Sequence, residues 1–403
     1  MNSWLESYKM YRFTASPTRD LSISDLRIAL INYICAKQSD KLFIVRMEDI
    51  DKAKKIESKD AEILDILSIF GLNYDYLYYQ SENFKYHLQF ASSLMDKGLA
   101  FACFCKEDEL QDGTCAKECN NISQEELLNN NLPFTIRLKS QDENFLIMTQ
   151  QKYPTANFAN ACDDMLQGIT HIIKEDAYIL DIPRQELIRV SLGYTQDIKY
   201  SHLPTLINEK DDTSSVKWLL NQGFLPEAIV NYLLLLGNTP PKEIFTLSEA
   251  MEWFKLDEIS KTPLKFDIEK LKAINAQHIM MMPELELSKI IGYSSTDIGK
   301  LAKLYAKQVS TTFEIKEKID GVFSLKTSQE YSEGLDILKM IVKKAPYFEK
   351  FEEFKNHLMS ESKMQGENFF KTLRILLTAN KDGLEELEEV YEHIKNYLLE
   401  IAR

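Results

Sequence analysis

The sequence predicts an α/β fold for the N-terminal part of the chain and an all-helical fold for the remainder. Residues 11–14 and 42–47 have the pattern of buried strands, and apolar residues at helical spacing lie between them. A strand, a helix and a second strand within about 40 residues form a βαβ unit, whose handedness puts a ligand at the carboxyl ends of the strands. From residue 240 onwards the pattern is helical.

The helix of this unit has a recognisable start. Pro17 and Asp20 indicate a turn after the first strand. Ser22 or Ser24 can then cap the helix, because a serine oxygen accepts a hydrogen bond from a free N–H group of the first turn. The apolar residues that follow are Ile23, Leu26, Leu30, Tyr33 and Ile34. Their helical spacing predicts one buried face.

Four segments are expected along the chain. Residues 1–100 and 134–238 are the two halves of the α/β domain, residues 101–133 are a cysteine-rich insertion, and residues 239–403 are the helical domain. Helices of the last segment are expected at residues 247–254, 268–281, 296–307, 330–344, 349–359 and 383–402. The pattern predicts neither an internal repeat nor a low-complexity tract.

The composition restricts the class of protein. A chain of 403 residues exceeds the roughly 250–300 residues that one core supports, so two or three domains are expected. The formal net charge of −14 argues against indiscriminate nucleic-acid binding, although a local basic patch would permit a specific contact. No apolar run reaches the roughly 20 residues of a membrane span, and no signal peptide is recognisable. We expect a cytoplasmic protein without membrane contact.

Four cysteines fall close together in the insertion. Cys103, Cys105, Cys115 and Cys119 form a C-x-C pair and a C-x3-C pair. In a reducing compartment such a group is more typical of a metal site than of disulfides. Four thiolates suit tetrahedral Zn²⁺ and leave no open position, so the site would be structural. The alternative is a set of free thiols from a lost site.

Residues 12–18 read Arg-Phe-Thr-Ala-Ser-Pro-Thr, and residues 46–51 read Arg-Met-Glu-Asp-Ile-Asp. Both segments resemble the catalytic domain of glutamyl-tRNA synthetases, the bacterial class I enzymes. The family begins Arg-Phe-Ala-Pro-Ser-Pro-Thr-Gly, and this chain has Arg12-Phe13 and Ser16-Pro17-Thr18. The family's second strand ends Arg-Ile-Glu-Asp-Thr-Asp, to which residues 46–51 correspond. The resemblance covers residues 10–403. It implies a class I synthetase Rossmann-type catalytic domain with a small insertion, followed by an all-α anticodon-binding-like domain.

The first ATP signature of that family is altered here. Arg19 stands where the family has Gly, Ser22 where it has the signature His, and Ser24 where it has the signature Gly. Glycine lets phosphate oxygens approach backbone N–H groups, and imidazole can carry a positive charge that serine cannot. Arg19 could supply charge instead. Ser22 and Ser24 are interpreted mainly as helix caps.

The second ATP signature is shortened. In the family a mobile Lys-Met/Leu-Ser-Lys-Arg loop neutralises the triphosphate, and here only residues 210–213, Lys-Asp-Asp-Thr, remain. Two carboxylates would repel a triphosphate unless a metal intervened. Lys210 is the remaining candidate for a catalytic cation, and binding of ATP with Mg²⁺ is therefore in doubt.

The resemblance also implies a glutamate pocket. Its candidate residues are Arg12, Ser16, Glu48, Asn160 and Lys174. Ala156 stands where the family has a Tyr, and Lys174 stands where it has an Arg. A single ammonium does not reproduce the planar fork of a guanidinium. The alternative is that Arg12 and Glu48 only pair with other charges.

These departures lead to three function hypotheses. The first is a degenerate relative of glutamyl-tRNA synthetase that binds tRNA but has lost, or nearly lost, the ATP-dependent activation of glutamate. The second is a working glutamate–tRNA ligase that uses substitutes such as Arg19 and Lys210. The third is a protein with an altered acyl substrate or a protein-binding scaffold. We expect a monomer whose partners are tRNA, glutamate bound weakly and, on the third hypothesis, another protein.

Overall fold

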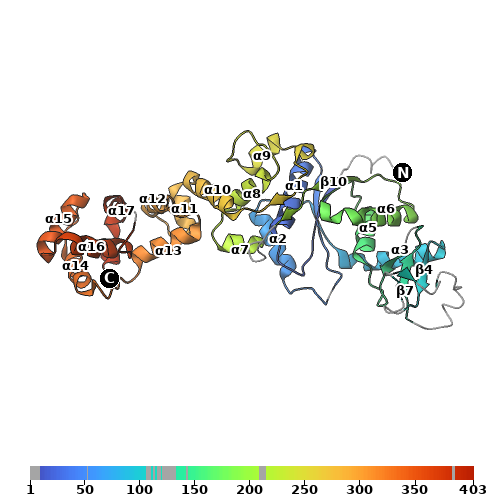
Figure 1. Ribbon diagram of the computed structural model, residues 1–403, viewed down its shortest axis with the longest axis horizontal. Helices are drawn as coiled ribbons and strands as arrows, with labels where there is room; N and C mark the ends of the chain where they lie inside the picture. The colour runs from blue at the N-terminus through green and yellow to red at the C-terminus, as the bar shows by residue number, and fades with distance from the viewer. Residues whose placement is uncertain are drawn as a thin grey trace. The chain divides into compact units, whose positions relative to one another are not determined.

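The computed structural model describes residues 10–51, 53–105, 110–111, 114–115, 119, 133–141, 144–207, 215–383 and 386–403 (Figure 1). The chain forms two compact units. The first contains the residues up to Lys217 together with Leu234–Pro241 and Leu247–Phe266. The second contains Trp218–Leu233, Lys242–Thr246 and Asp267–Arg403. Among the described residues, no helix is both long and apolar enough to cross a membrane.

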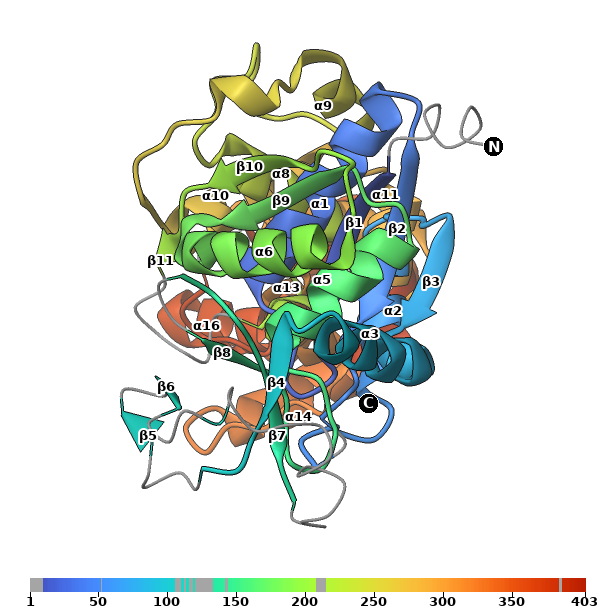
Figure 2. The ribbon, with the colours of Figure 1, turned by 90° about the vertical axis from the view of Figure 1, so that its right-hand side faces the viewer.

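A five-stranded parallel sheet is the centre of the first unit. Its strand order is β10–β9–β1–β2–β3, and the neighbouring strands can be followed in Figure 2. The strands are β1 (Met10–Ala15), β2 (Leu42–Met47), β3 (Tyr76–Tyr79), β9 (His171–Glu175) and β10 (Lys199–Leu203). The chain leaves β1 toward β2 on one side and returns as β9 on the other. Open α/β sheets bind ligands at the carboxyl ends of strands where the order reverses in this way.

The predicted strand–helix–strand unit is confirmed. Helix α1 (Ile23–Gln38) packs against β1 and β2, and Leu26 and Leu30 on its inner face are fully buried. Ser22 caps the helix, because its side chain accepts a hydrogen bond from the Asp25 N–H at 3.1 Å. The Asp25 carboxylate accepts one in return from the Ser22 N–H at 3.0 Å. This capping box satisfies two N–H groups at the start of the helix.

An antiparallel sheet with order β4–β7–β8 lies between the halves of the parallel sheet in sequence. It consists of β4 (Ala100–Cys103), β7 (Thr135–Leu138) and β8 (Phe145–Met148). Helices α3 (Phe84–Asp96), α5 (Ala156–Leu166) and α6 (Ile182–Leu192) share one apolar cluster with it, which includes Leu94, Ile147, Phe158 and Ile188. This packing holds α5, which carries residues of the candidate site, in a fixed position.

Short elements complete the first unit. They are α2 (Lys59–Ile69), η2 (Gln80–Asn83), β5 (Leu110–Gln111), β6 (Thr114–Cys115), η5 (Asp176–Asp181), β11 (Leu206–Ile207), α9 (Leu247–Trp253), η7 (Leu256–Glu258) and β12 (Leu264–Lys265). Strands β11 and β12 pair in parallel. Helix α9 and β12 therefore belong with the sheet domain although they follow it in sequence.

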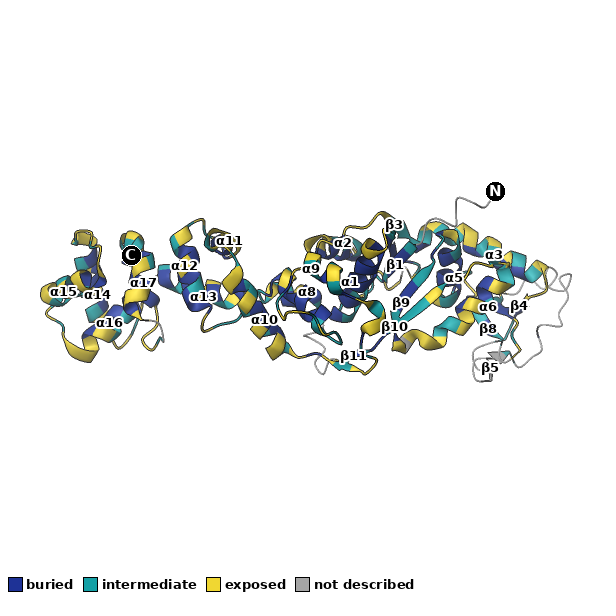
Figure 3. Cartoon of the chain, turned by 90° about the horizontal axis from the view of Figure 1, so that it is seen from above, coloured by how far each residue is buried: buried dark blue, intermediate teal, exposed yellow. Residues whose placement is uncertain are grey.

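The second unit is helical, as predicted for the C-terminal region. It contains parts of α7 (Val216–Asn221) and α8 (Pro226–Leu235). Its other helices are α10 (Ile268–Met281), α11 (Glu284–Ile290), α12 (Thr296–Tyr305), α13 (Thr312–Phe323), α14 (Ser332–Lys344), α15 (Phe351–Ser362), α16 (Gly366–Thr378), α17 (Leu387–Ile394) and α18 (Leu398–Ile401). Figure 3 shows buried and exposed faces on these helices. On α14 the buried face includes Leu335, Leu338 and Val342, which follow the helical repeat.

Candidate functional site

A cavity of about 380 Å³ lies at the carboxyl ends of β1, β2 and β9. Six of the candidate site residues line it, namely Arg12, Ser16, Arg19, Glu48, Asn160 and Lys174, and Ala156 lines it as well. The sheet, the turn after β1 and helix α5 therefore bring together side chains that are up to 162 residues apart in the chain. Ser22 and Ser24 do not line this cavity. Lys210 lies outside the described residues.

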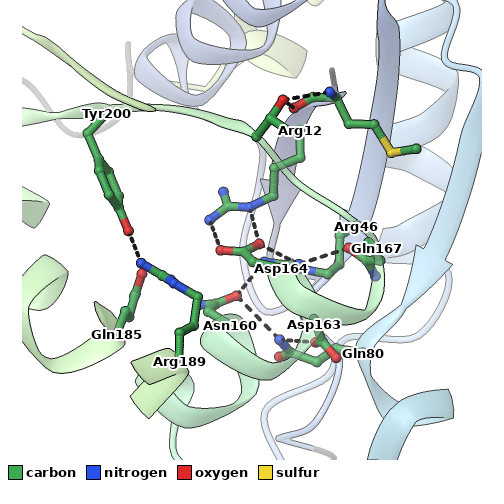
Figure 4. Close-up of polar contacts among 12 residues, drawn as sticks. Arg12, Arg46, Gln80, Asn160, Asp163, Asp164, Gln167, Gln185, Arg189 and Tyr200 are labelled. Atoms are coloured by element: carbon green, nitrogen blue, oxygen red, sulfur yellow. Dashed lines mark hydrogen bonds and ion pairs between the residues drawn. The ribbon is translucent and has the colours of Figure 1, made fainter. Parts of the chain in front are cut away.

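Arg12 is held by a carboxylate that the sequence patterns do not single out. The Nε and Nη2 atoms of Arg12 donate to the two carboxylate oxygens of Asp164 at 2.6 and 3.0 Å. Arg46 Nη1 donates to the same carboxylate at 2.9 Å (Figure 4). Burial alone would raise the pKa of Asp164, but the two guanidinium groups outweigh it and hold this pKa well below its usual value. Nη1 of Arg12 is the guanidinium nitrogen that remains for a ligand.

Asn160 is fixed by the same network. Arg46 Nη2 donates to Asn160 Oδ1 at 2.8 Å, and Gln80 Nε2 donates to that oxygen at 3.3 Å. Gln80 Nε2 also donates to Asp163 at 2.9 Å, and Asp163 lies 2.8 Å from the Nε2 atom of His87. The oxygen of Asn160 is therefore occupied, and its amide nitrogen is the group left to donate to a ligand.

Two opposite charges in the cavity lack a direct hydrogen-bonded or ion-paired partner within the described part of the chain. Among the described residues, the side chains of Lys174 and Glu48 make no hydrogen bond and no ion pair. Lys174 Nζ lies 5.8 Å from the centre of the Tyr178 ring. Burial, reinforced by the positive charge of Arg12, lowers the pKa of Lys174 to about 8. Lys174 and Glu48 attract each other across the cavity without forming an ion pair. Two opposite charges that face one cavity without direct contact suit a ligand that carries both charges.

The altered signature residues have local partners. Arg19 Nη1 and Nη2 donate to the Asp25 carboxylate at 2.7 and 3.1 Å. Ser22 is the cap described above, and the Ser24 side chain hydrogen-bonds to Glu175. Of these three signature positions, only Arg19 reaches the cavity. It is half exposed, with 54% of its side-chain surface accessible.

A second cavity of about 690 Å³ adjoins the first. Ser16, Glu48 and Ala156 line both cavities. Tyr153 and Pro154 give the second cavity part of its apolar wall. Ala156 contributes only a methyl group to the wall that the two cavities share.

The four cysteines of the insertion converge. The sulfur atoms of Cys103, Cys105, Cys115 and Cys119 all lie within 4.8 Å of one another, and none of these residues forms a disulfide. The Cys105 sulfur lies 3.5 Å from that of Cys115 and 3.8 Å from that of Cys119. Zn–S bonds of about 2.3 Å in a tetrahedron place sulfurs about 3.8 Å apart. Both the donor set and its spacing therefore fit Zn²⁺.

Sequence reasoning missed Asp164, Gln80 and the role of Arg46. Asp164 is fully buried although α5 presents it next to a second aspartate, Asp163. Two adjacent acidic residues usually suggest an exposed helix face. The available signal was the strand pattern around Arg46, because an arginine inside a buried strand requires an anionic partner.

Comparisons with known proteins agree with this architecture. Residues 10–133 and 123–273 match the family of tRNA synthetases class I (E and Q), catalytic domain. Glutamate–tRNA ligase 2 of Sulfurimonas denitrificans is 43% identical over 98% of this chain and 100% of its own length. Glutamate–tRNA ligase 1 of Campylobacter jejuni subsp. jejuni serotype O:23/36 is also 43% identical over the same shares. Glutamate–tRNA ligase 1 of Nitratiruptor sp. is 44% identical over 98% of this chain.

Two solved structures share the fold. A glutamate tRNA ligase from Elizabethkingia meningosepticum, crystallised with its amino acid, has a TM-score of 0.74 at 20% identity and covers 98% of both chains. A glutamate-tRNA synthetase from Elizabethkingia anophelis has a TM-score of 0.73 at 20% identity and covers 98% of this chain and 99% of its own. The predicted α/β sheet with an insertion and a helical C-terminal region is thereby confirmed.

The prediction of a degenerate protein that has lost ATP-dependent activation is wrong. Relatives that match the chain from end to end at 43% identity are named glutamate–tRNA ligases. The prediction depended on residues missing from two ATP signatures. It neglected the possibility that cations elsewhere in the fold take over their task.

Proposed function

The chain belongs to the family of class I tRNA synthetases for glutamate and glutamine, and we propose that it is a working glutamate–tRNA ligase. In this reaction, a glutamate carboxylate attacks the α-phosphate of ATP to give enzyme-bound glutamyl adenylate and pyrophosphate. A ribose hydroxyl at the 3′ end of tRNA then attacks the adenylate and releases AMP. The proposal requires one cavity that holds glutamate in a fixed direction.

This proposal depends on Glu48 and Lys174, two opposite charges that face the cavity without a hydrogen bond or ion pair within the described residues. Glu48 can accept hydrogen bonds from the α-ammonium group of glutamate, and the Lys174 ammonium can hold the side-chain carboxylate. Arg12 Nη1 is oriented by Asp164 to assist Lys174. A ligand held at both ends leaves its α-carboxylate free for the reaction with ATP.

Arg19 supports the activation step. Its half-exposed guanidinium lines the cavity where the turn after β1 meets α1. In this position it can approach a phosphate of ATP and replace part of the missing positive charge. Asp25 holds it there until the nucleotide binds. Lys210 remains a second candidate for this task.

Zinc would hold the insertion together. Cys103, Cys105, Cys115 and Cys119 would be its ligands, and four thiolates would leave no position for substrate. The ion would therefore stabilise the fold of the insertion without entering the reaction. Elemental analysis of anaerobically purified protein tests this, and protein without bound zinc would reject it.

The experiment for the main proposal is aminoacylation of total tRNA with labelled glutamate in the presence of Mg²⁺ and ATP. We expect glutamyl-tRNA to form, and glutamine in place of glutamate to give at least about tenfold less product, because its amide does not pair with the Lys174 ammonium. The variant Lys174→Met is the matched control and should lose this preference. If no tRNA accepts glutamate, the proposal is rejected.

A further inference from the structure

Three segments that are distant in sequence meet beside the turn that follows β1. The turn contributes Asp20, the first turn of α2 contributes Lys59 and Glu62, and the start of α7 contributes Ser215 and Lys217. We refer to these five residues as the turn cluster. Lys59 Nζ donates to Asp20 at 2.5 Å and to Glu62 at 2.7 Å, and Lys217 Nζ donates to Glu62 at 2.6 Å. The Ser215 hydroxyl donates to Asp20 at 3.2 Å.

The turn cluster joins the two regions in which the family carries its ATP signatures. The Val216 N–H donates to the Leu21 carbonyl at 2.9 Å, and Ser22 forms an isolated antiparallel bridge with Ser215. Arg19, the neighbour of Asp20, lines the amino-acid cavity. Lys59 and Lys217 therefore lie beside the turn where, by the family's signatures, the triphosphate of ATP would be bound.

Lys59 is a buried cation whose charge is favoured by its two carboxylate partners and opposed by its place at a helix start. It is the first residue of α2, where the helix dipole disfavours a positive charge, and it is only 8% exposed. Ser58 before it has a φ of +59°, in a backbone region that serine rarely adopts. Hydrogen bonds to Asp20 and Glu62 raise the pKa of Lys59, so the charge is retained. Lys59 is therefore an enclosed cation whose charge depends on two carboxylates, and phosphate oxygens could take the place of these carboxylates.

We propose that Lys59 and Lys217 bind the phosphates of ATP and replace the imidazole and the loop lysines that this chain lacks. The inference rests on the proposed ligase function. In the resting protein, Asp20 and Glu62 neutralise the two ammonium groups; on binding of Mg²⁺-ATP the lysines turn to the phosphates. Together with Arg19 they bring three positive charges to the turn, a number comparable to the cations of the missing loop.

A purely structural ion-pair network is the competing explanation. The two explanations predict different ATP binding when either the cation or the carboxylate of the Lys59–Asp20 ion pair is removed. Lys59→Met removes the cation, whereas Asp20→Asn leaves the cation and removes its competitor. If the ion pair is only structural, both changes break it and should affect ATP binding equally. If Lys59 binds phosphate, only Lys59→Met should weaken ATP binding.

The test is titration calorimetry of Mg²⁺-ATP with the full-length protein. We expect Lys59→Met to weaken binding about tenfold or more, Asp20→Asn to leave it unchanged or tighten it, and Lys59→Arg to restore most of it. Likewise, Lys217→Met should weaken binding, and Glu62→Gln should leave it unchanged or tighten it. Both effects should be smaller, because Lys217 is half exposed. Lys55→Met is the control, since Lys55 is also ion-paired near this turn but to Asp60, and it should bind as the wild type.

The outcomes separate this inference from the proposed ligase function. Calorimetry requires no turnover, so weakened binding in Lys59→Met with intact binding in Asp20→Asn supports the inference even if tRNA is not charged. Equal weakening in both variants, or unchanged binding in Lys59→Met, overturns it even if the wild type charges tRNA. A wild-type protein that binds no Mg²⁺-ATP overturns it as well.

Discussion

Asp164 accepts hydrogen bonds from Arg12 at both of its carboxylate oxygens, at 2.6 and 3.0 Å, inside a fully buried network. The pairing uses Nε and Nη2 of Arg12, so one guanidinium nitrogen remains for the cavity. Arg46 donates to the same carboxylate. Asp164 does not line the cavity, but it sets the direction of the Arg12 side chain, which does.

Replacing Asp164 by Asn should destabilise the protein by about 3–5 kcal/mol, because two buried guanidinium groups lose their counter-charge. Urea unfolding at pH 7 measures this change. Asp65→Asn on the exposed face of α2 is the control and should stay within about 0.5 kcal/mol of the wild type. Equal midpoints for the wild type and Asp164→Asn would contradict the described pairing.

The contribution of Asp164 should also depend on pH. Its pKa is lowered in the folded protein, so the unfolded chain binds the proton more readily as the pH falls. The stabilisation is fully present above the ordinary aspartate pKa of about 4 and is lost progressively below it. The difference in unfolding free energy between the wild type and Asp164→Asn should therefore be constant from pH 7 to 5 and shrink below pH 4. A difference that does not change down to pH 3 would argue against this assignment.

Glutamate recognition should weaken in alkaline solution. Burial and Arg12 lower the pKa of Lys174 to about 8, so above this pH it loses the charge that we propose to hold the substrate carboxylate. The value of kcat/KM for glutamate should fall above pH 8, approaching a tenfold loss per pH unit. In Lys174→Arg the charge persists, and the profile should stay flat to about pH 9.5. If both proteins lose activity in parallel, another group is responsible.

Loss of one thiol should release the metal and loosen the insertion. Cys115→Ser removes one of four ligands, so zinc content should fall well below one ion per chain and the insertion should be cleaved faster by a protease. Cys35→Ser is the control, because Cys35 is buried in α1 and far from the cluster in sequence. Equal zinc content in all three proteins would mean that the cluster does not bind zinc.

In the helical unit, Lys326 holds the end of α13. Its Nζ atom donates to the carbonyls of Gly321, Val322 and Ser324 at 2.8, 2.5 and 2.8 Å, and the residue is 3% exposed. Lys326→Met should cost about 2–3 kcal/mol, because the last carbonyls of the helix lose a charged donor. Thermal or urea unfolding measures the loss. The control Lys307→Met, at an exposed position, should change the free energy of unfolding little. An equally small change in Lys326→Met would show that water replaces the Lys326 ammonium at these carbonyls.

Much of the first unit is predictable because local patterns determine it. The alternation of strand and helix in residues 11–47 requires only short-range information, and the spacing of the four cysteines already indicates a shared ligand. Contacts between residues that are far apart in sequence cannot be predicted from such local patterns. Nothing near Asp164 in sequence reveals that Arg12, 152 residues away, will be its partner.

The prediction that activity is lost was wrong for a related reason: a linear sequence does not show which residues of distant segments lie together. A position-by-position comparison with two signatures treats every residue that differs there as lost charge. The structure brings Lys59 from α2 and Lys217 from α7 to the turn after β1, where neither could be expected from a linear pattern. A charge needed at one point in space can be supplied from any segment that folds next to it.

The most direct test of the central claim is glutamate-dependent exchange of labelled pyrophosphate into ATP, measured with the purified wild type in the presence of tRNA. A working ligase predicts exchange that requires glutamate and Mg²⁺ and that falls by about 100-fold or more in Lys174→Met. Absence of exchange above background with glutamate, at any tRNA concentration and with Mg²⁺ and ATP in excess, would contradict the claim.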